Sequence, residues 1–134
     1  MTVKLETRSI RTLAYFEKKT NVHAKDCIIT DDCIYFLVEP DKIGMAVGKN
    51  GFIIKDIRRA FGKNVKVLGY YHDPEEMLRS LMPGIKSIDI TDSSMIVTIP
   101  RDERVAAIGR NGSNIKIARE IMNRHFSVKN LRLR

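Results

Sequence analysis

The sequence predicts an α+β protein built from two copies of one small unit, residues 1–71 and 72–134. Three observations predict this class. A Gly-x-x-Gly segment occurs twice, each time between helix-like apolar runs. Two runs of strand length and β-rich composition precede each segment, and a third follows it. The chain of 134 residues has room for two very small domains. Each unit is expected to run helix, strand, strand, helix, helix, strand, with a three-stranded sheet packed against helices.

The two copies align when the sequence is shifted by 61 positions, which places Asp41 on Asp102. Self-similarity at a fixed spacing indicates a duplicated structural unit. The identical positions of the first copy are Asp41, Ala46, Gly48, Asn50, Gly51, Ile54, Lys55 and Arg58.

The first unit opens with residues 8–20, where Ile10, Leu13, Ala14 and Phe16 recur at helical spacing. Two β-rich runs follow, "CIIT" and "CIYFLVE", and the Asp-Asp pair between them predicts a hairpin. Pro40 begins a short helix, the glycine segment interrupts it, and residues 52–61 resume it. The run "NVKVLGYY" predicts the third strand.

The second unit begins with the clearest helix start in the chain. Asp73 is a preferred N-cap residue, Pro74 suits the first helical position, and Glu76 completes a capping box. Pro83 and Gly84 are expected to end this helix.

The rest of the second unit repeats the order of the first. The runs "IKSIDIT" and "SMIVTI" predict a hairpin, and Asp102 is expected to cap the next short helix. Gly109 to Gly112 interrupt that helix, which resumes to about His125 before a final strand, "SVKNLRL".

Each Gly-x-x-Gly loop stands at the start of a helix, where backbone N–H groups and the helix dipole favour anions. Glycine has no side chain, so a phosphate chain can approach closely. Lys49 and Arg110 add a cation to each loop, and Asn50 and Asn111 add hydrogen-bonding groups that tolerate tight turns. The loops therefore suit a sugar-phosphate backbone.

The helices that follow the loops are amphipathic. Their predicted core positions are Ile54, Ile57 and Phe61 in the first unit and Ile115, Ala118 and Met122 in the second. Their predicted outer positions are Lys55, Arg58 and Arg59, and Lys116 and Arg119. Glu120 replaces Arg59 in the second copy, which predicts different affinities for the two loops.

The composition narrows the function classes. A net charge of +8 and a pI near 9.7 favour a polyanionic partner. No apolar run is long enough to cross a membrane and the first ten residues lack the apolar core of a signal peptide, so we expect a cytoplasmic monomer that binds no membrane. Cys27 and Cys33 are expected as buried thiols, with a hairpin disulfide, or zinc bound with His23, as weaker alternatives.

An enzyme is not predicted, and no cofactor is expected. Walker A and dinucleotide-binding patterns are absent, and no set of acids, bases or metal ligands converges in the sequence.

The segments "VGKNGFIIKDI" and "IGRNGSNIKIA", with the order of elements around them, are similar to KH domains of type II, whose extra helix is on the N-terminal side. Two such domains with almost no linker resemble the tandem KH core of the NusA family, in particular its short archaeal members. The resemblance covers practically the whole chain. It implies binding of single-stranded RNA, each domain holding about four nucleotides.

The resemblance further implies a role in transcription elongation, termination or antitermination, with RNA polymerase as a second partner. Longer bacterial members carry a polymerase-binding domain and an oligonucleotide-binding barrel, for which these 134 residues leave no room. The RNA-binding residues it implies are Gly48, Lys49, Asn50, Gly51, Lys55 and Arg58, and Gly109, Arg110, Asn111, Gly112, Lys116 and Arg119. Val47 and Ile108 are implied as the apolar groove under the bases.

A second hypothesis is a KH-based protein-interaction scaffold on RNA polymerase or a ribonucleoprotein, with RNA binding secondary. Its surface would come from Tyr35, Phe36, Tyr70 and Tyr71, which are more often core residues of strands. A duplex DNA reader of the helix-turn-helix class does not explain the hairpin before each loop.

Overall fold

The computed structural model of the chain describes residues 7–134. It divides into two compact units, Met1–Tyr70 and Tyr71–Arg134. Within the described residues each unit has three α-helices and a three-stranded sheet. The elements follow the predicted order in both units, and the α+β class is confirmed.

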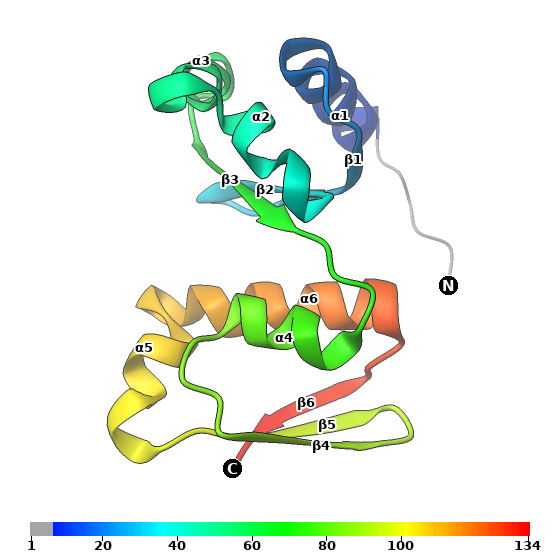
Figure 1. The fold of residues 1–134 in the computed structure, drawn as a ribbon, viewed down its shortest axis with the longest axis vertical. Coiled ribbons are helices and arrows are strands. Elements are labelled where there is room, and N and C mark those ends of the chain that lie inside the picture. The colour runs from blue at the N-terminus through cyan, green and yellow to red at the C-terminus, as the bar shows by residue number, and fades with distance from the viewer. Residues whose placement is uncertain (1–6) are drawn as a thin grey trace. The chain divides into compact units, whose positions relative to one another are not determined.

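The first unit places its helices on one side of its sheet (Figure 1). Its elements are α1 (Thr7–Thr20), β1 (Ala24–Ile29), β2 (Cys33–Val38), α2 (Ile43–Val47), α3 (Phe52–Phe61) and β3 (Asn64–Gly69). The sheet order is β1-β2-β3, with β1 antiparallel and β3 parallel to β2. The parallel pair requires a crossover connection, which the helices α2 and α3 supply.

The predicted hairpin between β1 and β2 is confirmed, and Thr30 fastens it. The Thr30 N–H and hydroxyl both donate to the Cys33 carbonyl oxygen, each at 2.9 Å. The Cys33 N–H donates in return to Thr30 Oγ1 at 3.0 Å. These bonds satisfy the backbone groups at the point where the ladder ends.

The core of the first unit centres on Phe16 and Phe36, whose rings stack at 4.0 Å between centroids. Both residues are fully buried, as are Ala46 from α2 and Ile57 from α3. Burial of a side chain of this size contributes roughly 1.5–3 kcal/mol. Every helix of the unit therefore contributes a fully buried residue to the core.

Only some of the residues predicted to form the buried face of α1 are buried, because Ile10 is 52% exposed and Ala14 is exposed as well. The buried stripe instead includes Thr12, Phe16 and Thr20. The two threonine hydroxyls donate to the carbonyl oxygens four residues earlier, each at 2.7 Å. This back-bonding satisfies the hydroxyls, so threonine can occupy a buried position that apolar spacing alone does not indicate.

The second unit also places its main helices on one side of its sheet (Figure 1). Its elements are α4 (Pro74–Leu81), β4 (Ser87–Thr91), β5 (Ser94–Thr98), α5 (Arg104–Ile108), α6 (Ser113–Phe126) and β6 (Asn130–Leu133). The order is β4-β5-β6, again with one antiparallel and one parallel pair. Met77, Leu78, Met95, Ile121 and Met122 are fully buried.

The two capping predictions for this unit have opposite outcomes. Asp73 caps α4, since its Oδ2 accepts the Glu76 N–H at 2.9 Å. Asp102 does not cap a helix: it lies inside a 3-10 turn, Arg101–Glu103, and no side chain caps that turn or α5. Because of this additional turn, Asp102 lies in the first turn and not at a capping position. Its negative charge there still interacts favourably with the positive end of the helix dipole.

Neither Cys27 nor Cys33 forms a disulfide and both residues are buried, so the hairpin disulfide is absent. Burial raises the pKa of the Cys33 thiol above its ordinary value. Burial and the neighbouring Cys33 raise the pKa of Tyr35 to about 12. Across residues 7–134, no three His, Cys, Asp or Glu side chains gather as a metal site needs. None of the helices in that range is both long and apolar enough to cross a membrane.

Candidate nucleic-acid interface

The first Gly-x-x-Gly loop is a tight turn between α2 and α3. Gly48 has φ 81° and ψ 167°, Asn50 has φ 55° and ψ 22°, and Gly51 has φ 73° and ψ 18°. The Gly51 N–H donates to the Gly48 carbonyl oxygen at 3.0 Å and closes the turn. The backbone of Gly48 is in a region open almost only to glycine, and asparagine is among the residues that best tolerate the left-handed conformation.

The second loop has the same geometry. Gly109 has φ 83° and ψ 168°, Asn111 has φ 56° and ψ 26°, and Gly112 has φ 73° and ψ 19°. The Gly112 N–H donates to the Gly109 carbonyl oxygen, again at 3.0 Å. The sequence repeat is therefore a repeat of backbone shape as well.

The first glycine of each loop lets the following helix approach closely. A Cβ placed on Gly48 would lie 2.7 Å from Ile53 Cγ1, and one on Gly109 would lie 2.9 Å from the Asn114 backbone nitrogen. In the first unit this contact is apolar packing. In the second unit Asn114 Nδ2 also donates to the Ala106 carbonyl oxygen at 3.3 Å, so a hydrogen bond ties α6 to α5.

The centre of each loop offers backbone donors to solvent. The N–H groups of Lys49 and Asn50, and those of Arg110 and Asn111, form no hydrogen bond with another described residue. All four residues are exposed. Unpaired N–H groups beside a helix N-terminus are a favourable place for an anion.

Lys55 and Lys116 lie beside their loops, where the sequence predicted a cation. A Cβ on Gly51 would lie 3.8 Å from Lys55 Cε, and one on Gly112 would lie 3.6 Å from Lys116 Cε. Both side chains therefore run past the second glycine. Each loop gains a second positive charge next to its own Lys49 or Arg110.

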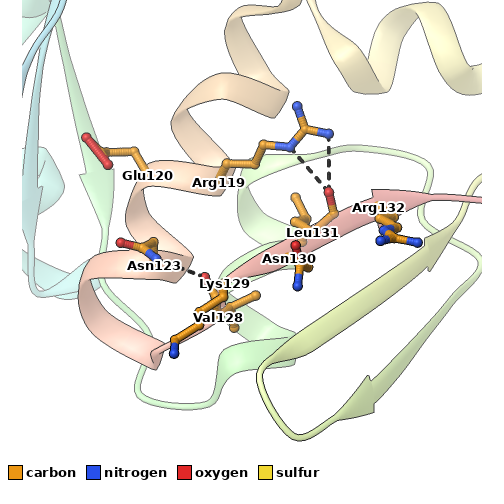
Figure 2. Close-up of a pocket in the computed structure, with 8 residues that line it drawn as sticks. All are labelled: Arg119, Glu120, Asn123, Val128, Lys129, Asn130, Leu131 and Arg132. Carbon is orange, nitrogen blue, oxygen red and sulfur yellow. Dashed lines mark hydrogen bonds between the residues drawn. The ribbon is translucent and has the colours of Figure 1, made fainter.

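Arg58 and Arg119 make contacts that sequence reasoning did not predict. Nε and Nη2 of Arg58 donate to the Val65 carbonyl oxygen of β3 at 3.3 and 3.1 Å. The equivalent atoms of Arg119 donate to the Leu131 carbonyl oxygen of β6 at 3.3 and 3.2 Å (Figure 2). Each arginine thus ties its helix to the last strand of its unit. A guanidinium has five N–H donors, so three remain for other partners.

A cavity of about 470 Å³ lies between α6 and β6 of the second unit (Figure 2). The residues that line it are Arg119, Glu120, Asn123, Val128, Lys129, Asn130, Leu131 and Arg132. Asn123 Nδ2 donates to the Val128 carbonyl oxygen at 3.2 Å. In the alignment of the two copies, Asn123 falls on Gly62, the residue that follows the last residue of α3. The helix α3 has 10 residues, whereas α6 has 14 and continues past Asn123. The longer helix forms one wall of this cavity.

Other predicted residues have mixed surroundings. Val47 and Ile108, the predicted groove residues, are half-buried beside their loops. Tyr35, Phe36 and Tyr70 are buried, so they form no exposed aromatic patch. The sequence did not predict that three apolar residues near the loops would be exposed, because apolar residues within a helical pattern are ordinarily assigned to the core. These are Met45, Phe52 and Val105, with exposed fractions of 48%, 64% and 84%.

Comparisons with known proteins agree on one family. A family model for the NusA-like second KH domain matches residues 75–133. The chain is 29% identical over 137 residues to the probable transcription termination protein NusA of Methanocaldococcus jannaschii, covering 98% of this chain and 75% of that protein. For the same protein of Methanococcus vannielii the identity is 31% over 139 residues, with 99% and 80% covered.

A solved structure is similar over almost the whole chain. The crystal structure of APE1850 matches with a TM-score of 0.85 and 32% identity, covering 97% of this chain and all of that one. The similarity therefore extends through both units.

Proposed function

Since this chain belongs to the NusA family in its short archaeal form, we propose that it acts in transcription termination or antitermination by binding single-stranded RNA through both Gly-x-x-Gly loops. The proposal includes no catalytic step. Because the family acts in transcription, we also propose RNA polymerase as a second partner. The proposed setting is the cytoplasm, with the protein as a monomer.

The observation that carries this proposal is the duplicated loop. Two segments far apart in the chain share the same unusual dihedral angles, the same unpaired N–H groups and a cation at the same place. A turn that only joined two helices would need none of the exposed donors or cations. Exposed backbone N–H groups and cations are among the groups that bind the phosphates of nucleic acids.

In the proposed mechanism each loop holds the RNA backbone and leaves the bases to the surface beside it. The N–H groups of Lys49 and Asn50 donate to a phosphate, and Lys55 neutralises its charge. The half-buried Val47 supports the base. Arg110, Asn111, Lys116 and Ile108 perform the same tasks in the second unit. Arg58 and Arg119 contribute the N–H donors that their strands leave unused.

We assign each unit to the type II KH arrangement. The order of elements supports this assignment, because a helix precedes the hairpin in each unit. The sheets support it as well, since the last strand lies parallel to the middle one. Each KH unit of this kind holds about four nucleotides, so roughly eight or more are engaged by the chain.

The test is to reverse the charge of one loop. In the double variant Lys49→Asp with Asn50→Asp, two carboxylates repel the phosphate at a site where neither native side chain is buried. We expect RNA affinity to fall at least about tenfold, since each lost phosphate contact weakens binding. Fluorescence anisotropy with labelled single-stranded RNA measures the affinity, and circular dichroism checks the fold.

The matched control is Lys18→Asp with Asn21→Asp. Lys18 and Asn21 are exposed, and Asn21 has a left-handed backbone like Asn50, with φ 57°. The net charge changes equally, but outside the loop. If the two double variants bind RNA equally well, the loop assignment is wrong. Recovery of RNA polymerase by the loop variant after nuclease treatment would support the scaffold hypothesis instead.

A further inference from the structure

Phe52 is an aromatic residue that the first unit leaves uncovered. It is the first residue of α3, directly after Gly51, and it is 64% exposed. Ile54 and Ile57 of the same helix are 5% and 0% exposed, so the core face of α3 is turned away from Phe52. Among the large apolar side chains that the described residues expose, Phe52 is the one aromatic ring.

The backbone beneath this ring is held firmly. The Phe52 N–H donates to the Lys49 carbonyl oxygen, within the turn that Gly48 and Gly51 close. Ile53 packs against Gly48 on the other side of the turn. Phe52 is two residues from Asn50, which is at most about 7 Å of chain. The backbone that carries the ring is thus held close to the N–H groups proposed to hold a phosphate.

The surroundings of Phe52 favour a nucleic acid over an apolar protein surface. Lys49 is exposed in the same turn, and the Lys55 side chain runs past Gly51. A dry protein contact over Phe52 would remove these cations from water, which is unfavourable without anionic partners. Single-stranded RNA offers phosphates for the cations and a base for the ring, as in other single-strand binders.

We propose that the Phe52 ring stacks on one base of the RNA whose backbone the first loop holds. This inference rests on the proposed function. Ser113 occupies the equivalent position of the second unit and has no ring, so the second loop lacks such a platform. The first unit therefore binds unpaired RNA more tightly per nucleotide than its backbone contacts alone allow.

The affinity test uses three substitutions at this position and an oligoadenylate of about 12 nucleotides, which exceeds the expected footprint. Phe52→Ser copies the second unit, Phe52→Leu keeps an apolar side chain without a ring, and Phe52→Tyr keeps the ring. We expect the serine and leucine variants to bind roughly fivefold to a hundredfold more weakly, and the tyrosine variant to bind like wild type.

A spectroscopic test follows from the composition, because the chain has no tryptophan. Phe52→Trp introduces a single reporter, and a stacked base is expected to quench its emission as RNA is added. An abasic oligomer with the same phosphates is expected to cause no quenching. Ile10→Trp is the matched control, since Ile10 is 52% exposed on α1.

The outcomes separate this inference from the proposed function. If wild type binds no RNA, the proposed function fails. If wild type binds and the leucine variant binds equally well, the stacking inference fails while the proposed function stands. Quenching by the abasic oligomer, or equal quenching at position 10, would also overturn it. Thermal unfolding of each variant identifies any loss of affinity that comes from misfolding.

Discussion

Gly48 and Gly62 show how two glycines with positive φ can have different importance. Gly48 has φ 81° and Gly62 has φ 65°, so both exclude most side chains. A Cβ on Gly48 would collide with Ile53, whereas one on Gly62 would meet nothing within 4 Å. At Gly48 both the dihedral angle and the lack of room for a side chain require glycine, whereas at Gly62 only the dihedral angle favours it.

Gly48→Ala is therefore expected to destabilise the first unit more than Gly62→Ala does. The left-handed backbone alone costs about 1–2 kcal/mol, which is the effect expected at Gly62. At Gly48 the collision at 2.7 Å adds to that strain, for a total of about 2–4 kcal/mol. Urea denaturation measures both variants, and equal losses would contradict the argument.

Tyr35 gives the protein a weakness in alkali. Its pKa in the folded protein is about 12, above the ordinary value of 10.0, because burial disfavours the phenolate. The unfolded chain thus loses this proton at a lower pH than the folded protein does. The stabilising effect is complete below pH 10 and is lost as the pH rises toward about 12. The raised pKa of Cys33 acts in the same direction from its ordinary value of 9.0 upward.

We expect the melting temperature to fall more steeply above about pH 10 in wild type than in Tyr35→Phe, which has no phenolic proton to lose. Scanning calorimetry between neutral and alkaline pH measures the difference. Parallel curves for the two proteins would show that Tyr35 does not cause the loss.

At the scale of elements, each sheet ends in a strand whose outer carbonyl is bound by an arginine from the helix before it. β3 and β6 are edge strands of their sheets. Arg58 reaches Val65, and Arg119 reaches Leu131. Edge strands offer unpaired backbone groups to other chains, and a bound guanidinium covers one of these groups.

Arg119→Met is expected to loosen β6 even without RNA. It keeps an unbranched apolar stem but removes both donors to the Leu131 carbonyl. We expect a loss of about 1 kcal/mol, since the bonds are partly exposed to solvent. Hydrogen exchange of the β6 amides in the free protein measures it, with Arg124→Met on the same helix as control. If exchange in β6 is unchanged, Arg119 does not stabilise the strand, and its role would be to contact a ligand.

The sequence predicts elements whose signals are local. The start of α4 follows from Asp73, Pro74 and Glu76 within four positions, and the ends of α3 follow from flanking glycines. Asp102 was wrongly assigned as a cap because an additional 3-10 turn has no distinct signal. The helix-to-strand bond of Arg119 spans 12 positions, so no local pattern contains it. The exposure of Phe52 depends on tertiary packing in the same way.

At the scale of the whole molecule, the two units share one loop geometry but secure it differently. The first unit relies on Ile53 against Gly48, and the second adds the bond from Asn114 to Ala106. The units also differ at Phe52 and Ser113, and at Arg59 and Glu120. These differences predict unequal affinity within a duplicated architecture.

RNA length and salt concentration test the two-loop proposal. An oligomer of about four nucleotides fills one loop, and affinity is expected to rise steeply once the strand exceeds roughly eight, because the second contact becomes intramolecular. The log–log salt slope is expected near −0.7 per neutralised phosphate. The Lys49→Asp and Asn50→Asp double variant should reduce that slope by the share of the first loop. A slope unaffected by this variant would mean that the second loop alone binds RNA.

The bond that closes each turn, from the second glycine to the first, uses only main-chain atoms. The side chains of Lys49 and Arg110 are exposed and take no part in these main-chain bonds, so the shape of the turn does not depend on them. Randomising these two codons would yield a library of similarly folded proteins that differ in the chemistry they display. The duplicated architecture could then serve as a scaffold for selecting new ligand specificities, one turn at a time.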